Sequence, residues 1–387
     1  MSIQTQYLSS ILLYIVCFAV AAVLAGLAQV YQRATRPTVL SSSYTQVFRP
    51  NRIFFTLCFL VPFVLSSFRW EVGTDYKTYI SLYEAINSLS TGAQWVQQLL
   101  EVEPLYVLMN LLVKAIFNNP LPIFFISALL LLGFLFRAME DYHEKLSVML
   151  AVFVFLMLIF STTLNIMRQM ISVSIMFYAT RYVLAHNYRK AALWLFLALM
   201  FHYSALIVLP FWLFRGTKRY ERNVRIAMFS GLMLLFVLGT VFGSLFDRIR
   251  FLYTNETGSS PDVVLRIGLM LLRAPILVPI LLFRKQLIAH DERNRFWIIM
   301  AVFEVAFSYL GYILDVLNRL SLYFAVSWII LLPALVRSMP TRGGQYRMGA
   351  YVTLVCTGLW VFNTAISNYG DVLPYKSLFD VQFLSSL

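Results

Sequence analysis

Long apolar runs recur along the whole chain, and they constrain the fold more than any other feature of the sequence. Each run has about 17 to 25 residues, which is enough for an α-helix to cross a hydrocarbon core of roughly 30 Å. Within lipid every backbone N–H and C=O needs an internal partner, so these runs must be helical, and the alternating pattern of a membrane barrel is absent. The sequence therefore predicts an all-α, polytopic transmembrane helical bundle with short amphipathic outer segments.

The apolar runs divide the chain into about eleven spans, or twelve if a shorter run at 104–117 also crosses. The predicted spans lie near 11–31, 52–68, 121–137, 146–163, 166–185, 191–214, 226–246, 263–283, 296–314, 319–336 and 348–367. No soluble domain, low-complexity linker or sequence repeat interrupts them. We therefore interpret residues 1–387 as a single integral membrane domain.

Composition supports a lipid environment and argues against other classes of protein. Of the 387 residues, 60% are hydrophobic and 13% are charged, whereas about a quarter of a typical soluble domain is charged. The net charge of +13 comes mostly from short loops between spans, so membrane orientation and anionic headgroups explain it better than nucleic acid does. The three cysteines lie in separate apolar spans, and no acidic pair or histidine cluster has metal-ligand spacing, so we expect no disulfide, metal or cofactor.

The distribution of charge predicts which loops are cytoplasmic. Loops 32–52, 215–225, 284–295 and 337–347 are rich in arginine and lysine, which the positive-inside rule places in the cytoplasm. Segment 69–103 carries more acidic than basic residues and belongs outside. We therefore expect an outer segment over 69–120 that leads back into the bundle.

The run at 191–214 leaves two topologies open, because basic residues flank both of its ends. In the first, 191–214 is a bent or re-entrant element with His202 at its outer apex, and 104–117 lies along the outer surface. In the second, 104–117 is a true span and Arg189 and Lys190 lie outside as an exception. We favour the first, because it brings Arg168 and His202 to the face that holds Asp75.

Polar residues inside apolar runs are costly in lipid and usually face a protein interior or a wet cavity. Asn165, Arg168 and Gln169 interrupt one run, with Asn165 and Arg168 on the same helical face. We expect Arg168 to bind an anion, although an arginine at a helix end also snorkels to headgroups. His202 is a candidate general base, with a packing role as the alternative.

Two further arginines and one glycine-containing turn are candidate ligand-binding groups. Arg266 and Arg273 are seven residues apart on one helical stripe and can form a pair of anion contacts. The alternative is that Arg266 snorkels and Arg273 pairs with a carboxylate such as Glu304. The outer motif FRWEVGTDYKTY places acidic, cationic and aromatic groups around Gly73, a combination that suits a sugar phosphate but also an ordinary surface turn.

Six motifs in this order resemble the EpsG family of Wzy-like bacterial exopolysaccharide and O-antigen polymerases. They are RWEVGTDYKTY at 69–79, EPLY at 103–106, NIMRQMIS at 165–172, MFHYSALIVLP at 200–210, NRLSLYF at 318–324 and VLPYKSLF at 372–379. The resemblance implies polymerisation of undecaprenyl-diphosphate-linked repeat units at the outer face of the bacterial inner membrane. A growing glycan would leave its diphosphate carrier and join a hydroxyl of the incoming unit.

The resemblance also implies functional positions in this chain. They are Arg69, Gly73, Thr74, Asp75, Tyr76, Glu103, Asn165, Arg168, Gln169, His202, Arg319 and Tyr323. We expect His202 and Asp75 as candidate bases with Glu103 in reserve, and Arg168 as the first ligand of the leaving diphosphate. The remaining positions, with Arg266 and Arg273, are candidate substrate contacts, and Arg319 is the first among them for the diphosphate.

Two rival activities use similar features. A ligase that moves finished glycan to another acceptor shares the donor and the chemistry. A flippase or transporter would also use intramembrane arginines, but it should show internal repeats and broken helices in matching halves, which the sequence lacks. Beyond the lipid bilayer and the lipid-linked donor and acceptor, the expected partners are a chain-length regulator and a flippase of the same pathway, and no nucleic acid.

Overall fold

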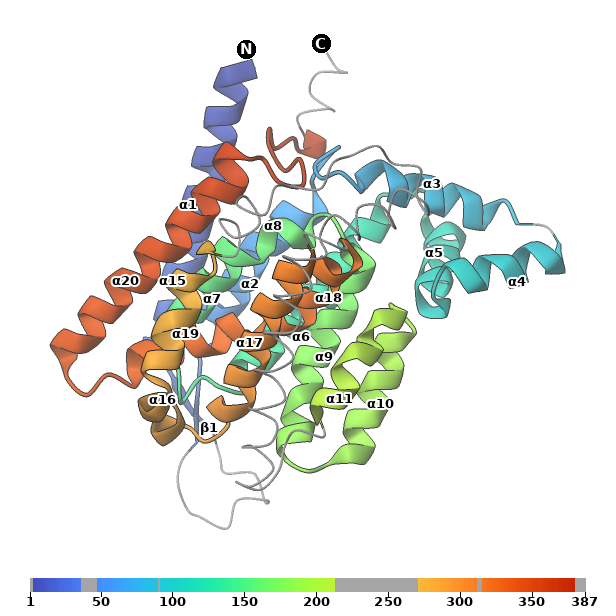
Figure 1. Ribbon diagram of the computed structural model, residues 1–387. Coiled ribbons are helices and arrows are strands. Elements are labelled where there is room, and N and C mark those ends of the chain that lie inside the picture. The colour runs from blue at the N-terminus through green and yellow to red at the C-terminus, as the bar shows by residue number, and fades with distance from the viewer. Residues whose placement is uncertain (1–2, 36–46, 90, 213–270, 312–314, 380–387) are drawn as a thin grey trace, which may run out of the picture.

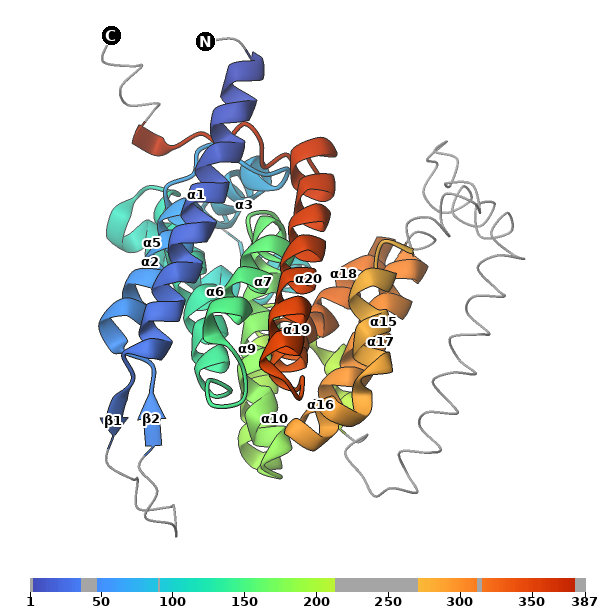
Figure 2. The same cartoon turned by 90° about the vertical axis from the view of Figure 1, so that its left-hand side faces the viewer.

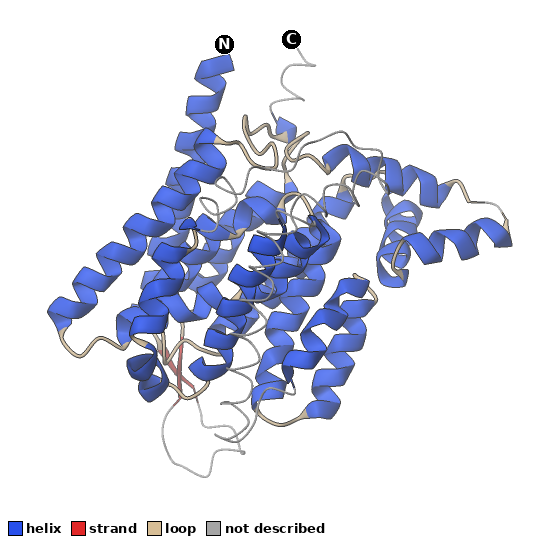
Figure 3. Ribbon diagram, in the orientation of Figure 1, coloured by secondary structure: helices blue, strands red, loops and turns tan. Residues whose placement is uncertain are grey.

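The computed structural model describes residues 3–35, 47–89, 91–212, 271–311 and 315–379. These residues are overwhelmingly helical, and the strands among them are two of three residues each, β1 (Arg33–Thr35) and β2 (Val47–Arg49), paired antiparallel (Figure 3). Within the described part of the chain, four helices are long and apolar enough to cross a membrane: Gln4–Val30, Pro122–Glu140, Leu317–Arg337 and Arg342–Ile366. The predicted class of all-α, multi-pass membrane protein is confirmed.

The helices of the amino-terminal part are α1 (Ile3–Val30), α2 (Arg52–Ser67), α3 (Tyr76–Asn87), α4 (Gly92–Glu101), α5 (Pro104–Phe117), α6 (Pro122–Glu140), α7 (Val148–Leu158), α8 (Phe160–Thr163), α9 (Met167–Leu184), α10 (Tyr188–Leu199), the 3₁₀ helix η1 (Tyr203–Val208) and α11 (Leu209–Trp212). The helices that follow are α15 (Ala274–Leu282), α16 (Arg284–His290), α17 (Asn294–Gly311), α18 (Asp315–Ala325), α19 (Ser327–Arg337), α20 (Arg342–Trp360) and the π-helix η2 (Val361–Ile366).

Local sequence signals account for several helix boundaries. Pro104 and Pro122 stand in the first turns of α5 and α6, where a missing N–H costs nothing. Asn51, Ser147 and Thr341 cap α2, α7 and α20 with their side-chain oxygens, each satisfying a backbone N–H that the helix leaves free. The starts of α2, α6 and α7 fall within two residues of the predicted spans, whereas α20 begins six residues before its predicted span.

The two ends of the bundle carry different kinds of segment. The start of α1, the segment α3 to α5 and the last described residues lie at the end drawn uppermost, which we call the upper end (Figure 1). The β1–β2 ribbon, α16 and the turns α9–α10 and α19–α20 lie at the opposite, lower end (Figures 1 and 2). Basic residues dominate the lower segments and acidic residues the upper segments, as the charge pattern predicted.

Helix packing in the main bundle rests on interlocking aromatic rings. Near α1, Phe18 packs edge-on against both Phe160 and Trp360, with ring centroids 5.5 and 6.0 Å apart. Trp297 of α17 likewise packs against Tyr142 and Phe177 at 5.9 and 5.6 Å. Such tilted contacts suit the ring quadrupoles and hold α1, α9, α17 and α20 in fixed relative positions.

Helix α5 begins and ends at the upper end. Glu103, the residue just before α5, contacts Arg168 at the start of α9. The next helix, α6, also begins at this end, because Phe124 stacks flat on Tyr76 with centroids 4.4 Å apart. Because the segments before and after α5 both lie at the upper end, α5 does not traverse the bundle. α3, α4 and α5 instead extend sideways from it (Figure 1).

Helix α10 and the η1–α11 segment form a hairpin. α10 runs along α9 from the lower end, and its last turn reaches the start of α9, where Ser172 donates to the carbonyl of Ala198. The chain then turns at 200–202. Phe211 packs against Phe303 and Phe324 in the middle of the bundle, at 4.5 and 4.7 Å, so the chain has turned back downward.

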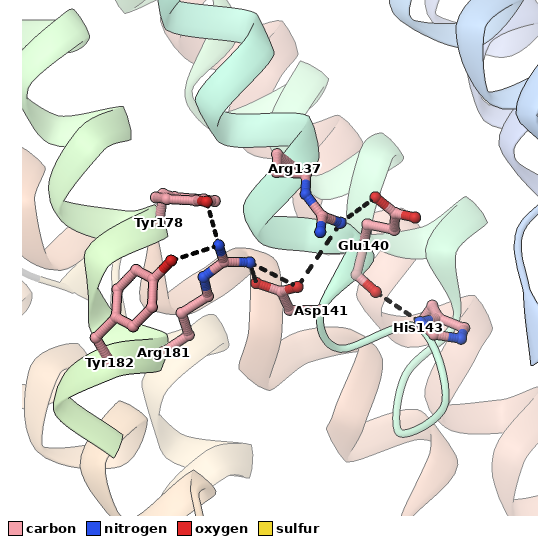
Figure 4. A network of polar contacts seen from close by, with 7 residues as sticks. All are labelled: Arg137, Glu140, Asp141, His143, Tyr178, Arg181 and Tyr182. Atoms are coloured by element: carbon pink, nitrogen blue, oxygen red, sulfur yellow. Dashed lines mark hydrogen bonds and ion pairs between the residues drawn. The ribbon is translucent and has the colours of Figure 1, made fainter. Parts of the chain in front are cut away.

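A polar cluster at the lower end ties α6 to α9 (Figure 4). The Arg181 guanidinium lies over the rings of Tyr178 and Tyr182, at 3.8 and 4.8 Å, and donates to both oxygens of Asp141 at 3.1 and 2.9 Å. Arg137 bonds to Glu140 of the same helix turn. The cluster fixes the base of α9, at the opposite end from the start of that helix.

Several predicted spans are shorter or more broken than expected. The run 146–163 is divided into α7 and α8. The run 319–336 matches the candidate span Leu317–Arg337, which α18 and α19 form together. Residues 76–101, expected only as an outer segment, form two helices. The predicted span 226–246, the loop 215–225 and the first part of the predicted span 263–283 lie outside the described residues.

Candidate active site

Three polar side chains from distant parts of the sequence meet at the upper end of the bundle. Glu103 precedes α5, Arg168 lies in the first turn of α9, and His202 lies in the turn of the α10–η1 hairpin. Nη1 of Arg168 donates to Oε2 of Glu103 at 2.8 Å, and Nδ1 of His202 lies 3.0 Å from Oε1 of the same carboxylate. We call these three residues the Glu103 cluster.

The Glu103 carboxylate is the buried centre of this cluster. Its side chain is 5% exposed, whereas those of Arg168 and His202 are each 28% exposed. Burial raises the pKa of Glu103, but His202 and the charge of Arg168 outweigh this effect and hold the pKa below its ordinary value. Glu103 is therefore ionised near neutral pH and orients two partly exposed groups.

The contact between His202 and Glu103 is close but not linear. The separation of 3.0 Å is an ion-pair distance, yet the ring N–H is too poorly aligned to make a regular hydrogen bond. The carboxylate nevertheless faces Nδ1, which favours the tautomer with its proton on that nitrogen and a free lone pair on Nε2. An imidazole held in this way can accept a proton from a hydroxyl.

Arg168 keeps donors available beyond its contact with Glu103. Only Nη1 bonds to the carboxylate, and the guanidinium carbon lies 5.6 Å from the centroid of the Tyr106 ring. Gln169, the next residue, is buried and donates to the backbone carbonyl of Arg319 at 2.7 Å. This bond brings the start of α18 beside the start of α9, with the Arg319 side chain exposed. Arg168 and Arg319 thus belong to neighbouring helix ends.

A second cluster surrounds Asn165, just before α9. Thr74 donates to Asn165 Oδ1 at 3.1 Å and lies 3.2 Å from Asp75 Oδ1. Gly73 and Gly370 both have positive φ, and a Cβ on either would come within 2.7 or 2.4 Å of the Asn165 amide. Only glycine fits at these two positions. The outer loop and the carboxyl-terminal segment are therefore built around Asn165.

Arg69 and Tyr76 are buried beside this loop. The Arg69 side chain, 1% exposed, donates to the carbonyls of Ser66 and Leu164 at 2.6 and 3.0 Å. Burial lowers the pKa of Arg69 to about 10, so it remains charged at neutral pH. Tyr76 is 3% exposed and stacks on Phe124. Both residues hold the outer loop against the bundle.

Tyr323 of α18 is also buried, and its hydroxyl contacts two serines that the sequence gave no reason to single out. The hydroxyl lies 3.0 Å from Ser172 on α9 and 3.0 Å from Ser204 on η1. A short polar side chain in an apolar helix is a weak signal, because it can bond to its own helix. The contacts become visible only when the three segments are in place.

Arg266 and Arg273 were singled out because an arginine is costly within a membrane. Of the two, the structure describes only Arg273, which contacts neither the Glu103 cluster nor Asn165 in the interactions observed. Arg266 is outside the described residues. Arg273 immediately precedes α15, and its Nε lies 3.4 Å from Oε1 of Glu304. The Glu304 side chain is 2% exposed and also accepts a hydrogen bond from Ser308. The alternative expectation of an Arg273–Glu304 pair therefore matches the observed contact. Among the described residues, no three His, Cys, Asp or Glu side chains are grouped to hold a metal ion.

Comparison with known proteins supplies the family. No curated protein and no solved structure matches the chain. The model of the EpsG family matches residues 52–377, which include every segment that builds the Glu103 and Asn165 clusters. The chain therefore belongs to the EpsG family, which indicates a multi-pass membrane protein with a polymerase-like role in polysaccharide biosynthesis.

Proposed function

We propose that this protein is a glycosyltransferase of the polymerase type, which joins undecaprenyl-diphosphate-linked oligosaccharide repeat units at the outer face of the bacterial inner membrane. The observation that carries the proposal is the Glu103 cluster, in which a partly exposed imidazole and a partly exposed guanidinium share one buried carboxylate. A base beside an anion-binding group is what this reaction needs.

In the proposed reaction a hydroxyl of the incoming repeat unit attacks the anomeric carbon of the growing glycan. The new C–O bond forms as the bond from that carbon to the phosphate oxygen breaks, and the lipid diphosphate leaves with the electron pair. His202 Nε2 takes the hydroxyl proton, while Glu103 holds the opposite ring nitrogen and stabilises the resulting imidazolium.

Arg168 and Arg319 are proposed to hold the negative charge that grows on the leaving diphosphate. Arginine suits this task because its planar donor fork matches phosphate oxygens and stays charged. Arg168 lies at the start of α9, where the free backbone N–H groups of the first turn add a favourable field for an anion. Asp75 and Thr74, on the outer loop, are proposed to contact sugar hydroxyls.

The outer placement of the site follows from the charge distribution in our proposal. The lower end carries the basic segments, so it is assigned to the cytoplasm, and the Glu103 cluster to the outside. The α10–η1–α11 hairpin is then a re-entrant element, and α5 lies along the outer surface. A re-entrant turn is tolerated within a membrane protein because neighbouring helices satisfy its backbone.

The test uses a strain from which the gene is deleted. We expect it to accumulate single lipid-linked repeat units, and plasmid-borne wild-type protein to restore a ladder of longer glycans. His202→Ala should insert normally but leave single units. A ladder from the His202→Ala protein would remove the proposed base, and a deletion strain that still polymerises would remove the proposed function.

A further inference from the structure

Four polar groups close a ring around the turn that carries His202. Ser204 contacts the Tyr323 hydroxyl at 3.0 Å, Tyr323 donates to Ser172 at 3.0 Å, and Ser172 donates to the carbonyl oxygen of Ala198 at 2.9 Å. Ala198 and Ser204 stand on opposite sides of the turn. The ring therefore spans the base of the hairpin apex through two other helices, α9 and α18.

The Ala198 carbonyl determines which hydroxyl donates and which accepts at each step of the ring. A carbonyl only accepts, so Ser172 gives its single hydroxyl proton to Ala198, and Tyr323 gives its proton to Ser172. Ser204 must then be the donor to Tyr323. Within the ring each hydroxyl donates one bond and accepts no more than one, so removing one hydroxyl interrupts the ring.

The ring ends on the carbonyl that also holds the backbone of His202. The oxygen of Ala198 accepts the N–H of His202 at 2.9 Å and that of Phe201 at 3.1 Å. Tyr323 is 2% exposed and Ser172 is fully buried, so the ring is shielded from competing water. The Tyr323 hydroxyl is therefore linked to the His202 backbone through Ser172 and the Ala198 carbonyl.

The other side of the same turn is held by the segment that carries Glu103. The N–H of Leu105 donates to the carbonyl of Met200 at 3.0 Å, and the N–H of Tyr203 lies 3.4 Å from Glu103 Oε1. Hydrogen bonds therefore hold the turn to the start of α5 on one side and to the ring on the other. Movement on either side changes the separation of His202 from Glu103.

We propose that Tyr323 is a positioning residue, which sets the His202 imidazole against Glu103 through the Ser204–Tyr323–Ser172–Ala198 ring. The inference rests on the proposed function of His202 as the base. It replaces the substrate contact that the family resemblance implied for Tyr323, because a side chain that is 2% exposed with its hydroxyl engaged on both sides has no face to offer a sugar.

The first test is kinetic, with repeat units extracted from the deletion strain as substrate. In Tyr323→Phe and in Ser172→Ala we expect kcat to fall about tenfold, the effect of one hydrogen bond, with KM unchanged. The double variant should be no slower than either single variant, because both break the same ring. Tyr142→Phe, a buried tyrosine near the lower end whose hydroxyl has no hydrogen-bond partner, is the matched control and should remain at wild-type rate.

The second test needs no enzymatic activity. His202→Cys, in a Cys17→Ser background, is labelled with an impermeant maleimide from outside. Cys58 and Cys356 are fully buried and stay silent. We expect Tyr323→Phe to change the labelling rate at position 202, because the turn is released, and Tyr142→Phe to leave it unchanged.

The outcomes separate the positioning role from the alternatives. A raised KM with normal kcat, or wild-type behaviour of Tyr323→Phe in both tests, would overturn the inference. If the wild-type protein does not polymerise, the proposed function fails while the labelling test still decides whether the ring holds the turn. If Tyr323→Phe fails to insert, Ser204→Ala, at the half-buried start of the ring, takes its place with the same expected direction.

Discussion

Replacing Glu103 by glutamine is the change that most sharply tests how the site works. The amide keeps the size of the side chain but removes the charge that Arg168 and His202 share at 2.8 and 3.0 Å. The carboxylate is 5% exposed, so solvent screens these contacts little. We expect the Glu103→Gln protein to insert normally and to polymerise poorly.

The expected loss can be estimated from the two contacts. The hydrogen bond between the charged Arg168 and Glu103 contributes about 1.5–3 kcal/mol. The amide of Glu103→Gln would preserve only part of this bond and only part of the close contact with His202. Losing about 3 kcal/mol of positioning corresponds to a fall in turnover of about a hundredfold. Part of the loss reflects Arg168 left without its partner rather than the intrinsic strength of the pair.

The assay is the rate of glycan extension by membranes that contain equal amounts of each protein. Glu84→Gln removes an exposed carboxylate from α3 and serves as the matched control. We expect the control to extend glycan at the wild-type rate. Turnover of Glu103→Gln within about threefold of wild type would refute the idea that this carboxylate orients the base, since the change would then be under 1 kcal/mol.

Other consequences can be measured independently. Arg168→Lys should lose nearly as much activity as Arg168→Ala at equal membrane levels, because lysine lacks the planar fork; full-length polymer from Arg168→Lys would reduce Arg168 to a positive anchor. The pKa of Glu103 is lowered from 4.5 in the fold, so its stabilising contribution is present above pH 4.5 and is lost as the pH falls through the folded value. The melting temperature in detergent should therefore fall more steeply below pH 4.5 for wild type than for Glu103→Gln, and parallel curves would contradict this. Gly73→Ala should destabilise the protein by about 1–2 kcal/mol, because a φ of 97° strains any residue with a Cβ, and an unchanged melting temperature would oppose this view. A reporter inserted at Thr91 should be accessible from outside and one at Arg342 from the cytoplasm, and the reverse pattern would invert the proposed orientation.

The course of the helices could be predicted closely where an apolar run is uninterrupted. The predicted spans 121–137 and 166–185 correspond to α6 (Pro122–Glu140) and α9 (Met167–Leu184). The break at Ile159, which divides α7 from α8, could not be predicted, because it lies inside a continuous apolar run with no proline or glycine. Such breaks are set by packing against neighbouring helices rather than by local preference.

The site was only partly accessible from the sequence. Arg168 and His202 could be singled out because polar groups are costly in a membrane, and Glu103 through the family resemblance. Their meeting could not be foreseen, because Glu103 lies 65 positions from Arg168 and 99 positions from His202 in the chain. The sequence also did not indicate which candidate residues are buried. Arg69 and Tyr323 were predicted as ligand contacts, whereas packed helices enclose both side chains.

The central claim is that the Glu103 cluster polymerises lipid-linked glycan supplied on the outer face. Purified protein in proteoliposomes, with its orientation determined by protease access, would receive lipid-linked repeat units in the leaflet that faces the upper end. We predict a ladder of lengthening products from wild type and single units from His202→Ala. Transfer to a different acceptor, as by a ligase, or unchanged units moved across the membrane, as by a flippase, would contradict the account.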